Sequence, residues 1–548
     1  MNHFRWTVFP RIVLLMWILI LGAQVIALGS CRRADSENTG SFAVGKPVTL
    51  KILHDALTAD YLRQVVNHFQ ADKPVLSGGR PLVVELLEVP ALTAAKGLAF
   101  GKFKVDGWLA PSQALVEYVN AHRVNLGAKQ VECRRLFGSP YVLATHRDNL
   151  LDFGTQAQLS WHHLFQSTQS KASLMHAQPL SSHTGLGSLI QLANLCVDRR
   201  GTGLDLEVFN KERGFERLKE KEGFIGSYGE DEQILLRKAS ERSGPVRRFV
   251  LTTEQQMVSF NLATKDTPPP LTAVYLSEGS FWQDYSLCRS EADWVTPDRR
   301  VGLKLFSDYL IDPYSQQLVK KSAFRPIRDT VVSDPLTLQY GVRPDLPKRF
   351  LPPPAGELTA ELFKRWPELQ KPAALILVVD LSGSMEGEAL ARTKQAAIAL
   401  IEGLSDQDKA ALIVFSTQAK ILFPLTADRA SIIQAIGALQ AGGGSALFDA
   451  LSLGIQMLSQ EDLRDYRRQI VVFTDGPDRN SEVSLPLLTA AIENTTTQQD
   501  LNLAMIAIAG QELEPAALSE IARAARGFFT MTAASQLVET TVEIGRNL

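Results

Sequence analysis

The last third of the chain alternates unbroken apolar runs with amphipathic stretches. Apolar runs rich in Val and Ile are typical of strands that are buried on both faces of a parallel sheet. Four such strands are predicted, at 374–379, 409–415, 470–475 and 503–508. Each is followed by a stretch with helical spacing of apolar residues, at 388–404, 446–458, 485–494 and 515–525. This alternation predicts a doubly wound α/β domain with helices on both faces of the sheet.

A similar alternation runs through the middle of the chain, from residue 46 to residue 342. Strands are predicted at 47–54, 82–88, 106–110 and 141–145, with a helix at 61–69 and a helix start at 111–112. This order predicts a second α/β domain. Residues 198–232 are densely charged with both signs, which predicts either a solvated helix or an inserted loop.

Prolines mark the boundary between the two domains. Residues 343–356 hold Pro344, Pro347 and the run Pro352, Pro353 and Pro354. We therefore expect a proline-rich linker over 343–370, stiff and extended over 343–356, and a C-terminal domain over 371–548. Charge also changes here: residues 371–548 carry 13 basic and 21 acidic residues, a net charge of −8, whereas residues 1–370 carry 44 and 38, a net charge of +6. The two domains are expected to present separate surfaces to separate partners.

The N-terminus has the pattern of an export signal. Arg5 and Arg11 precede an apolar run at 12–28, which is short for a membrane span of about 20 residues. The boundary at 28–31 resembles a bacterial lipobox, which implies a signal peptide at 1–30, a lipid on Cys31 and a polar tether at 31–45. The alternative is an uncleaved signal anchor that ends near Leu28. Either alternative exports the protein and holds it at a membrane, facing the periplasm or the cell exterior.

Composition limits the number of domains, the kinds of partner and the roles of the cysteines. A chain of 548 residues with 45% hydrophobic content is long enough for two or three domains with sizeable cores. A net charge of −2 argues against nucleic acid as a partner. If Cys31 carries lipid, then Cys133, Cys196 and Cys288 allow at most one intrachain disulfide. Their spacing has no metal-binding pattern, so we interpret them as structural.

Carboxylates and hydroxyls follow two of the predicted C-terminal strands. Asp380, Ser382 and Ser384 follow the first strand, Asp475 ends another, and Ser445 follows three glycines at the start of a helix. Open α/β sheets bind ligands at the carboxyl ends of their strands, and a set made only of oxygen ligands suits a hard divalent cation. Each segment alone could be a helix N-cap or an ordinary turn. All three together, in this order, predict a metal site.

These three segments resemble the metal-ion-dependent adhesion site (MIDAS) of von Willebrand factor A domains. The family pattern is Asp-x-Ser-x-Ser, a Thr after a glycine-rich turn, and an Asp before a glycine. Ser445 replaces the usual Thr and keeps the hydroxyl. The resemblance implies Mg²⁺, or Mn²⁺ or Ca²⁺, bound directly by the serines and in part through water by Asp380 and Asp475. It also implies a coordination position left open for an acidic side chain of a protein partner.

The middle domain resembles the two-lobed, periplasmic extracellular solute-binding proteins of ABC transporters. The resemblance rests on 138–144 as a crossover strand, 182–187 as a turn before a helix, 252–256 and 273–282 as a return strand and loop, and 294–326 as a closing helical segment. It implies a solute cleft, whose candidate residues are Ser112, Thr184, Glu254, Tyr275, Glu278 and Trp282. Each of three candidates has an alternative role. Trp282 could be a core aromatic, Ser112 could be a helix N-cap, and Glu254 could be a surface carboxylate. His183 has no visible carboxylate partner in the sequence.

These features favour a membrane-anchored extracytoplasmic binding protein that engages a protein partner through its C-terminal metal site. The alternative is a solute receptor of an ABC-type transport or sensing system. No nucleophile elbow, zinc-protease helix or phosphate-binding loop is present, so we do not expect an enzyme.

Overall fold

The computed structural model describes residues 46–545 apart from 125–126, 150–158, 163, 165–171, 199–202, 230–231, 242–246, 265–268, 328–332, 461, 464, 500, 510–513 and 526. The predicted signal, the tether and Cys31 lie outside the described residues. Within the described part, no helix has both the length and the apolar character needed to cross a membrane.

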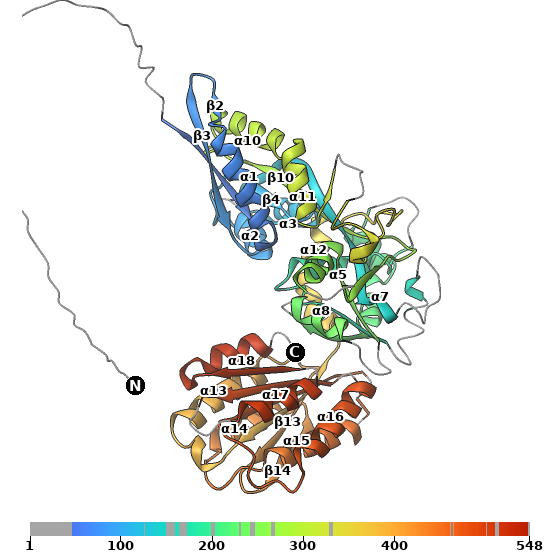
Figure 1. Ribbon diagram of the computed structural model, residues 1–548, viewed down its shortest axis with the longest axis vertical. Coiled ribbons are helices and arrows are strands. Elements are labelled where there is room, and N and C mark those ends of the chain that lie inside the picture. Colours follow the sequence, from blue (N-terminus) through green and yellow to red (C-terminus); the bar gives the residue numbers. More distant parts are fainter. Residues whose placement is uncertain are drawn as a thin grey trace, which may run out of the picture. The chain divides into compact units, whose positions relative to one another are not determined.

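The first lobe of the N-terminal domain is built on a mixed sheet (Figure 1). β1 (Val48–His54) pairs in parallel with β3 (Arg80–Glu88) and β4 (Gly107–Ala110), because the chain returns through a helix after each strand. The other elements of this lobe are β2 (Val75–Leu76), α1 (Ala59–Ala71), α2 (Ala91–Ala99), α3 (Gln113–His122), α10 (Pro297–Tyr309), α11 (Pro313–Lys321) and β11 (Arg325–Pro326). The apolar sides of α1, α10 and α11 pack on one face of the sheet.

Two long antiparallel strands lead from the first lobe into the second. β5 (Lys129–His146) pairs with β10 (Trp282–Glu291) in the first lobe and with β8 (Arg247–Thr253) in the second. The sheet order is β2-β3-β1-β4-β10-β5-β8-β6-β7, and β9 and β11 also pair with β5. The remaining elements of the second lobe are β6 (Ala172–Ala177), β7 (Ile225–Gly229), β9 (Leu271–Val274), α5 (His183–Ala193), α6 (Leu206–Lys211), α7 (Gly214–Glu222), α8 (Glu232–Ser240) and α9 (Glu254–Ala263).

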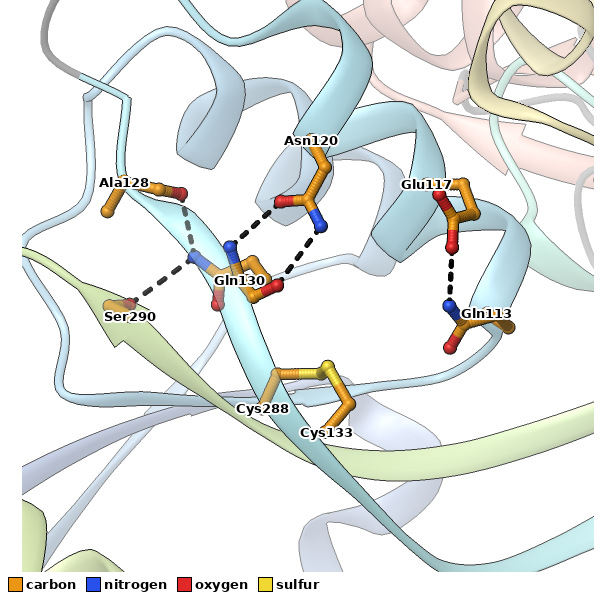
Figure 2. The surroundings of a disulfide bond; sticks show 8 residues. All are labelled: Gln113, Glu117, Asn120, Ala128, Gln130, Cys133, Cys288 and Ser290. Carbon is orange, nitrogen blue, oxygen red and sulfur yellow. Dashed lines mark hydrogen bonds between the residues drawn. A yellow bond between two sulfur atoms is a disulfide. The ribbon is translucent and has the colours of Figure 1, made fainter.

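A disulfide ties β5 to β10 within the sheet of the first lobe. Cys133 and Cys288 lie on neighbouring strands and are bonded across a sequence separation of 155 residues (Figure 2). Close by, the side-chain amide of Asn120 both donates to and accepts from the backbone of Gln130, at 3.0 and 2.8 Å. Cys196 is buried and free. The structure thus selects one pairing among the three cysteines.

The C-terminal domain is a six-stranded sheet between two helical layers. The order is β14-β13-β12-β15-β16-β17, and every neighbouring pair is parallel except β13 and β14. Helices α15, α16 and α17 pack on one face and α13, α14 and α18 on the other. The strands are β12 (Ala373–Asp380), β13 (Lys409–Phe415), β14 (Ala419–Thr426), β15 (Arg467–Thr474), β16 (Leu501–Ile508) and β17 (Phe528–Thr532). The helices are α13 (Glu388–Glu402), α14 (Arg429–Ala438), α15 (Leu447–Gln460), α16 (Leu485–Gln499), α17 (Pro515–Ala524) and α18 (Leu537–Gly545).

The predicted linker over 343–370 contains a helix in its second half. Residues 356–369 form helix α12 (Gly356–Leu369), whose apolar side joins the core that contains Trp108. The helix starts so close to α3 that a Cβ on Gly356 would lie 2.3 Å from the carbonyl oxygen of Glu117. The proline-rich residues before it also pack on the N-terminal domain, because Leu346 and Leu351 are buried. The first domain therefore extends to about Gln370.

Candidate metal site of the C-terminal domain

Adjacent parallel strands bring the two carboxylates to the same edge of the sheet. β12 and β15 run in register, with Val379 opposite Phe473, so Asp380 and Thr474 end their strands side by side. Asp475 follows directly after β15. Both strands are buried along their length because helices cover both faces, and only the turns after them reach the surface.

Hydrogen bonds fix the orientation of each carboxylate. One oxygen of Asp380 accepts from the backbone N–H of Ser382 at 2.8 Å, and the other accepts from the Thr474 hydroxyl at 2.7 Å. The Ser384 hydroxyl donates to Asp475 at 2.8 Å and lies 3.1 Å from the Ser382 hydroxyl. Four of the five predicted site residues are therefore positioned around one turn.

The glycine-rich turn closes on this cluster from the side. The backbone N–H of Gly383 donates to the carbonyl of Gly443 at 3.1 Å, and the N–H of Ser445 donates to the side chain of Asn480 at 2.9 Å. A Cβ on Gly444 would lie 1.9 Å from the Asn480 side-chain oxygen, so a larger residue here would displace the Asn480 side chain. The sequence prediction that the three segments meet is consistent with these contacts.

Burial makes the site electrostatically unfavourable for an unpaired negative charge. Asp380 is fully buried, and desolvation raises the pKa of its carboxyl to about 6, against the lowering effect of the hydrogen bonds from Thr474 and Ser382. The nearby Asp475 carboxylate raises this pKa further. A positive charge placed between the two carboxylates would relieve both effects.

The donor set fits a hard divalent cation. Ser445 is 4% exposed, and its hydroxyl oxygen is buried with no hydrogen-bond partner among the described residues. A buried hydroxyl without a partner is unfavourable, so a ligand at this position would stabilise it. The described residues hold no group of three or more His, Cys, Asp or Glu side chains that could bind a metal. Two carboxylates with three hydroxyls instead make a set of oxygen ligands that Mg²⁺ prefers.

Two supporting residues were missed by the sequence analysis. Thr474 orients Asp380, and Asn480 holds the backbone of Ser445. Thr474 could have been noticed, because it lies beside Asp475 at the end of the same strand. Asn480 gives no comparable signal, since its contact spans 35 residues of sequence.

Hydrogen bonds and burial describe the surroundings of three of the six residues predicted to line a solute cleft. Ser112 caps helix α3 by accepting from the N–H of Leu115 at 3.4 Å, and Glu278 accepts from the N–H of Trp161 at 2.9 Å. Thr184 is buried in the first turn of α5. The N-cap alternative for Ser112 is therefore confirmed, and Glu278 serves a nearby backbone group.

Glu254, Tyr275 and Trp282 gather around Arg325, which the sequence analysis did not single out. The Arg325 guanidinium donates two hydrogen bonds to the Glu254 carboxylate, at 2.7 and 2.6 Å, and its centre lies 5.8 Å from the Trp282 ring. Tyr275 also donates to Glu254. The interpretation of Glu254 as a surface carboxylate is wrong, because it is fully buried and paired. The pair links β11 of the first lobe to α9 of the second, and both carboxylate oxygens of Glu254 accept a hydrogen bond from Arg325.

A different polar cluster lies where the two lobes meet. Tyr285 donates to the Asp55 carboxylate at 3.1 Å, and the Gln283 amide donates to the hydroxyl of Tyr285 at 2.9 Å. The same amide lies 2.6 Å from Nε2 of His183, which is 3.8 Å from Asp55. Burial lowers the pKa of His183, while Asp55 raises it. The statement that His183 lacks a carboxylate neighbour is therefore corrected: Asp55 lies 128 residues earlier in the sequence and is close only in the fold.

The fold and the site define the C-terminal domain as a doubly wound α/β domain with carboxylates and hydroxyls at the carboxyl edge of its sheet. The family model of the von Willebrand factor type A domain matches residues 375–477, which contain all five candidate ligands. The C-terminal part of the chain is thus a von Willebrand factor type A domain. Domains of this family generally mediate protein–protein interactions.

Two curated proteins are similar to about a fifth of the chain. An uncharacterized protein of Synechocystis sp. is 38% identical over 113 residues, which are 20% of this chain and 27% of the relative. Human inter-alpha-trypsin inhibitor heavy chain H4 is 32% identical over 115 residues, 19% of this chain and 12% of the relative. The chain thus spans about a quarter or less of the length of these relatives.

Two solved structures are similar to separate parts of the chain. A von Willebrand factor type A protein from Catenulispora acidiphila is 24% identical, with 32% of this chain and 42% of that chain covered and a TM-score of 0.30. A periplasmic thiamin binding protein is 14% identical, with 59% of this chain and 96% of that chain covered and a TM-score of 0.42.

Proposed function

We propose that this protein is an exported binding protein whose C-terminal domain engages a protein partner through a divalent cation, with Mg²⁺ as the expected ion. Asp380, Ser382, Ser384, Ser445 and Asp475 would hold the ion, and the ion would supply a position for a partner carboxylate. The observation that carries the proposal is the buried Ser445 hydroxyl without a partner beside two oriented carboxylates. The domain's own residues supply the buried, rigid frame.

A pair of matched peptides tests this function. The full chain is expected to bind a short synthetic peptide with a central aspartate in Mg²⁺, and to lose at least about tenfold in affinity in EDTA. The same peptide with asparagine in place of aspartate is the control, because it keeps the shape and removes the charge. Fluorescence anisotropy measures both. Equal binding of the two peptides, or binding that EDTA does not change, would exclude carboxylate recognition by a bound metal.

Membrane attachment through Cys31 is part of the same proposal and rests on the sequence alone. Cys31→Ser is expected to move the protein from the membrane fraction to the soluble fraction or to leave it unprocessed, because the lipid requires that thiol. Ser36→Ala, in the predicted tether, is the control. Fractionation with N-terminal sequencing is the measurement. If the variant stays in the membrane and still begins at Met1, residues 12–28 are a signal anchor.

A solute receptor is the second candidate function, supported by the polar cluster of Asp55, His183, Gln283 and Tyr285 between the lobes. The Gln283 side-chain oxygen there is buried with no hydrogen-bond partner among the described residues. Such a group could accept a hydrogen bond from a polar solute. Native mass spectrometry of the purified full chain is the test, and a chain that carries no small molecule and binds none from a metabolite mixture would count against this candidate.

A further inference from the structure

A pocket of about 650 Å³ adjoins the candidate metal site on the surface of the C-terminal domain. Its apolar lining comes from Leu381, Val414, Phe415, Leu422 and Leu439. Leu381 stands between the ligands Asp380 and Ser382, and its backbone is held by Phe415 on one side and Gly442 on the other. The pocket and the metal site therefore share one segment of chain, so a single partner segment can reach both.

The charge in this pocket is positive. Lys420 is the one charged residue of its lining, which otherwise adds Ser416, Thr417, Gln418, Ala438 and Gln440. The Lys420 side chain is exposed and makes no ion pair or hydrogen bond with another described residue. The domain as a whole carries a net charge of −8. A lone cation beside a metal site favours a partner that carries more than one acidic group.

The strand that carries Lys420 is open for contact. β14 lies at the end of the sheet order and pairs with β13, with no further described strand beside it. Lys420 and Leu422 both line the pocket, and the pairing of β14 with β13 shifts register between Ile421 and Phe423. Leu422 is 42% exposed, although aliphatic side chains of its size are usually buried. An apolar side chain from a partner would cover it.

We propose that this pocket selects the partner, and that its occupant is an extended protein segment in which the metal-binding aspartate has an aliphatic residue and a second acidic residue as near neighbours. The aliphatic side chain packs on Leu422 and Leu381, and the second carboxylate pairs with Lys420. The inference rests on the proposed metal-dependent function, since the first aspartate anchors the segment. The pocket adds sequence preference to a metal contact that any carboxylate could make.

Synthetic peptides that share one central aspartate test the selection. The first peptide carries an aliphatic and an acidic neighbour. In a second peptide a polar residue replaces the aliphatic neighbour, and in a third a basic residue replaces the acidic neighbour. With the full chain in Mg²⁺, the first peptide is expected to bind about tenfold more tightly than the others. Lys420→Glu is expected to reverse the charge preference, so that the peptide with the basic neighbour binds best. Leu422→Ser is expected to remove the aliphatic preference.

Matched variants on another part of the domain serve as controls. Arg523→Glu makes the same change of charge on α17, and Leu487→Ser makes the same change of polarity on α16, where Leu487 is 67% exposed. Both should leave all preferences unchanged, and thermal melts confirm that all four variants fold. Metal-dependent binding without any neighbour preference, or a preference that Lys420→Glu leaves unchanged, overturns the pocket proposal alone. Binding that follows Lys420 but survives EDTA supports the pocket and rejects the metal-dependent function. Absence of binding by every peptide rejects both.

Discussion

Asp380→Ala is expected to abolish the stabilisation of the C-terminal domain by Mg²⁺ or Mn²⁺. A ligand that binds only the folded state adds RT ln(1 + [L]/Kd), or about 2.7 kcal/mol at a hundredfold excess over Kd. Asp380 supplies one of the two negative charges that offset the ion, and water cannot replace that charge. Differential scanning calorimetry of the full chain, with metal and with EDTA, measures the effect. The unfolding temperature of the wild-type C-terminal domain should rise with millimolar metal, and that of the variant should not.

Variants of the neighbouring positions separate loss of the metal from loss of the fold. Ser445→Ala should weaken the metal-dependent shift, because water can replace a neutral hydroxyl, and Ser445→Thr should preserve it. Asp428→Ala is the matched control: Asp428 caps α14 by accepting from the N–H of Ser431 at 3.1 Å. This variant should lower the stability of the domain while the metal-dependent shift stays intact. A wild-type domain that shows no shift with either metal would exclude a working metal site.

Removing the apolar side chains of α12 is expected to destabilise the N-terminal domain severely. Leu358 and Leu362 are fully buried in the same core as Trp108. Each Leu→Ala change in a core typically costs about 2–5 kcal/mol. Changing both should therefore cost about 4–10 kcal/mol, which is comparable to the entire stability of an ordinary domain. The helix belongs to the first domain, so the second domain should keep its own transition.

Tryptophan fluorescence isolates this effect, because residues 371–548 contain no tryptophan. Denaturant unfolding of the full chain, monitored by tryptophan fluorescence, should show the loss of N-terminal domain stability in the double variant Leu358→Ala with Leu362→Ala. Lys364→Ala, an exposed position on the same helix, should change little. The same reasoning predicts that a fragment ending at residue 355 fails to fold, whereas one ending at residue 370 folds. A stable fragment ending at 355 would show that α12 is dispensable.

The sequence predicted the elements whose burial is complete. β12 and β13 lie where continuous apolar runs placed them, because strands covered on both faces tolerate no polar interruption. β14 escaped prediction because it lies at the sheet edge, mixes Lys420 with exposed aliphatics and contains Pro424. The helix α12 was missed for another reason: the prolines before it and Pro367 within it outweighed the helical spacing of its leucines.

The candidate sites also differ in how far the sequence predicted them. Four of the five candidate metal ligands lie at or just after strand ends, so their proximity could be inferred from strand order, whereas Ser445 follows the glycine-rich turn before α15. The pair of Arg325 with Glu254 and the approach of His183 to Asp55 span 71 and 128 residues. No local pattern marks such contacts, because side chains that meet across lobes depend on how the lobes close.

The bond between Cys133 and Cys288 also determines what a protease can release. The chain between them builds almost all of the second lobe, so a cut within it leaves one covalent molecule that separates only after reduction. Cys196 lies inside this same loop, where burial raises the pKa of its thiol to about 12. Since only the thiolate attacks a disulfide, this thiol cannot readily reshuffle the bond at neutral pH. The lobe therefore remains a closed ring of chain for as long as its surroundings stay oxidising.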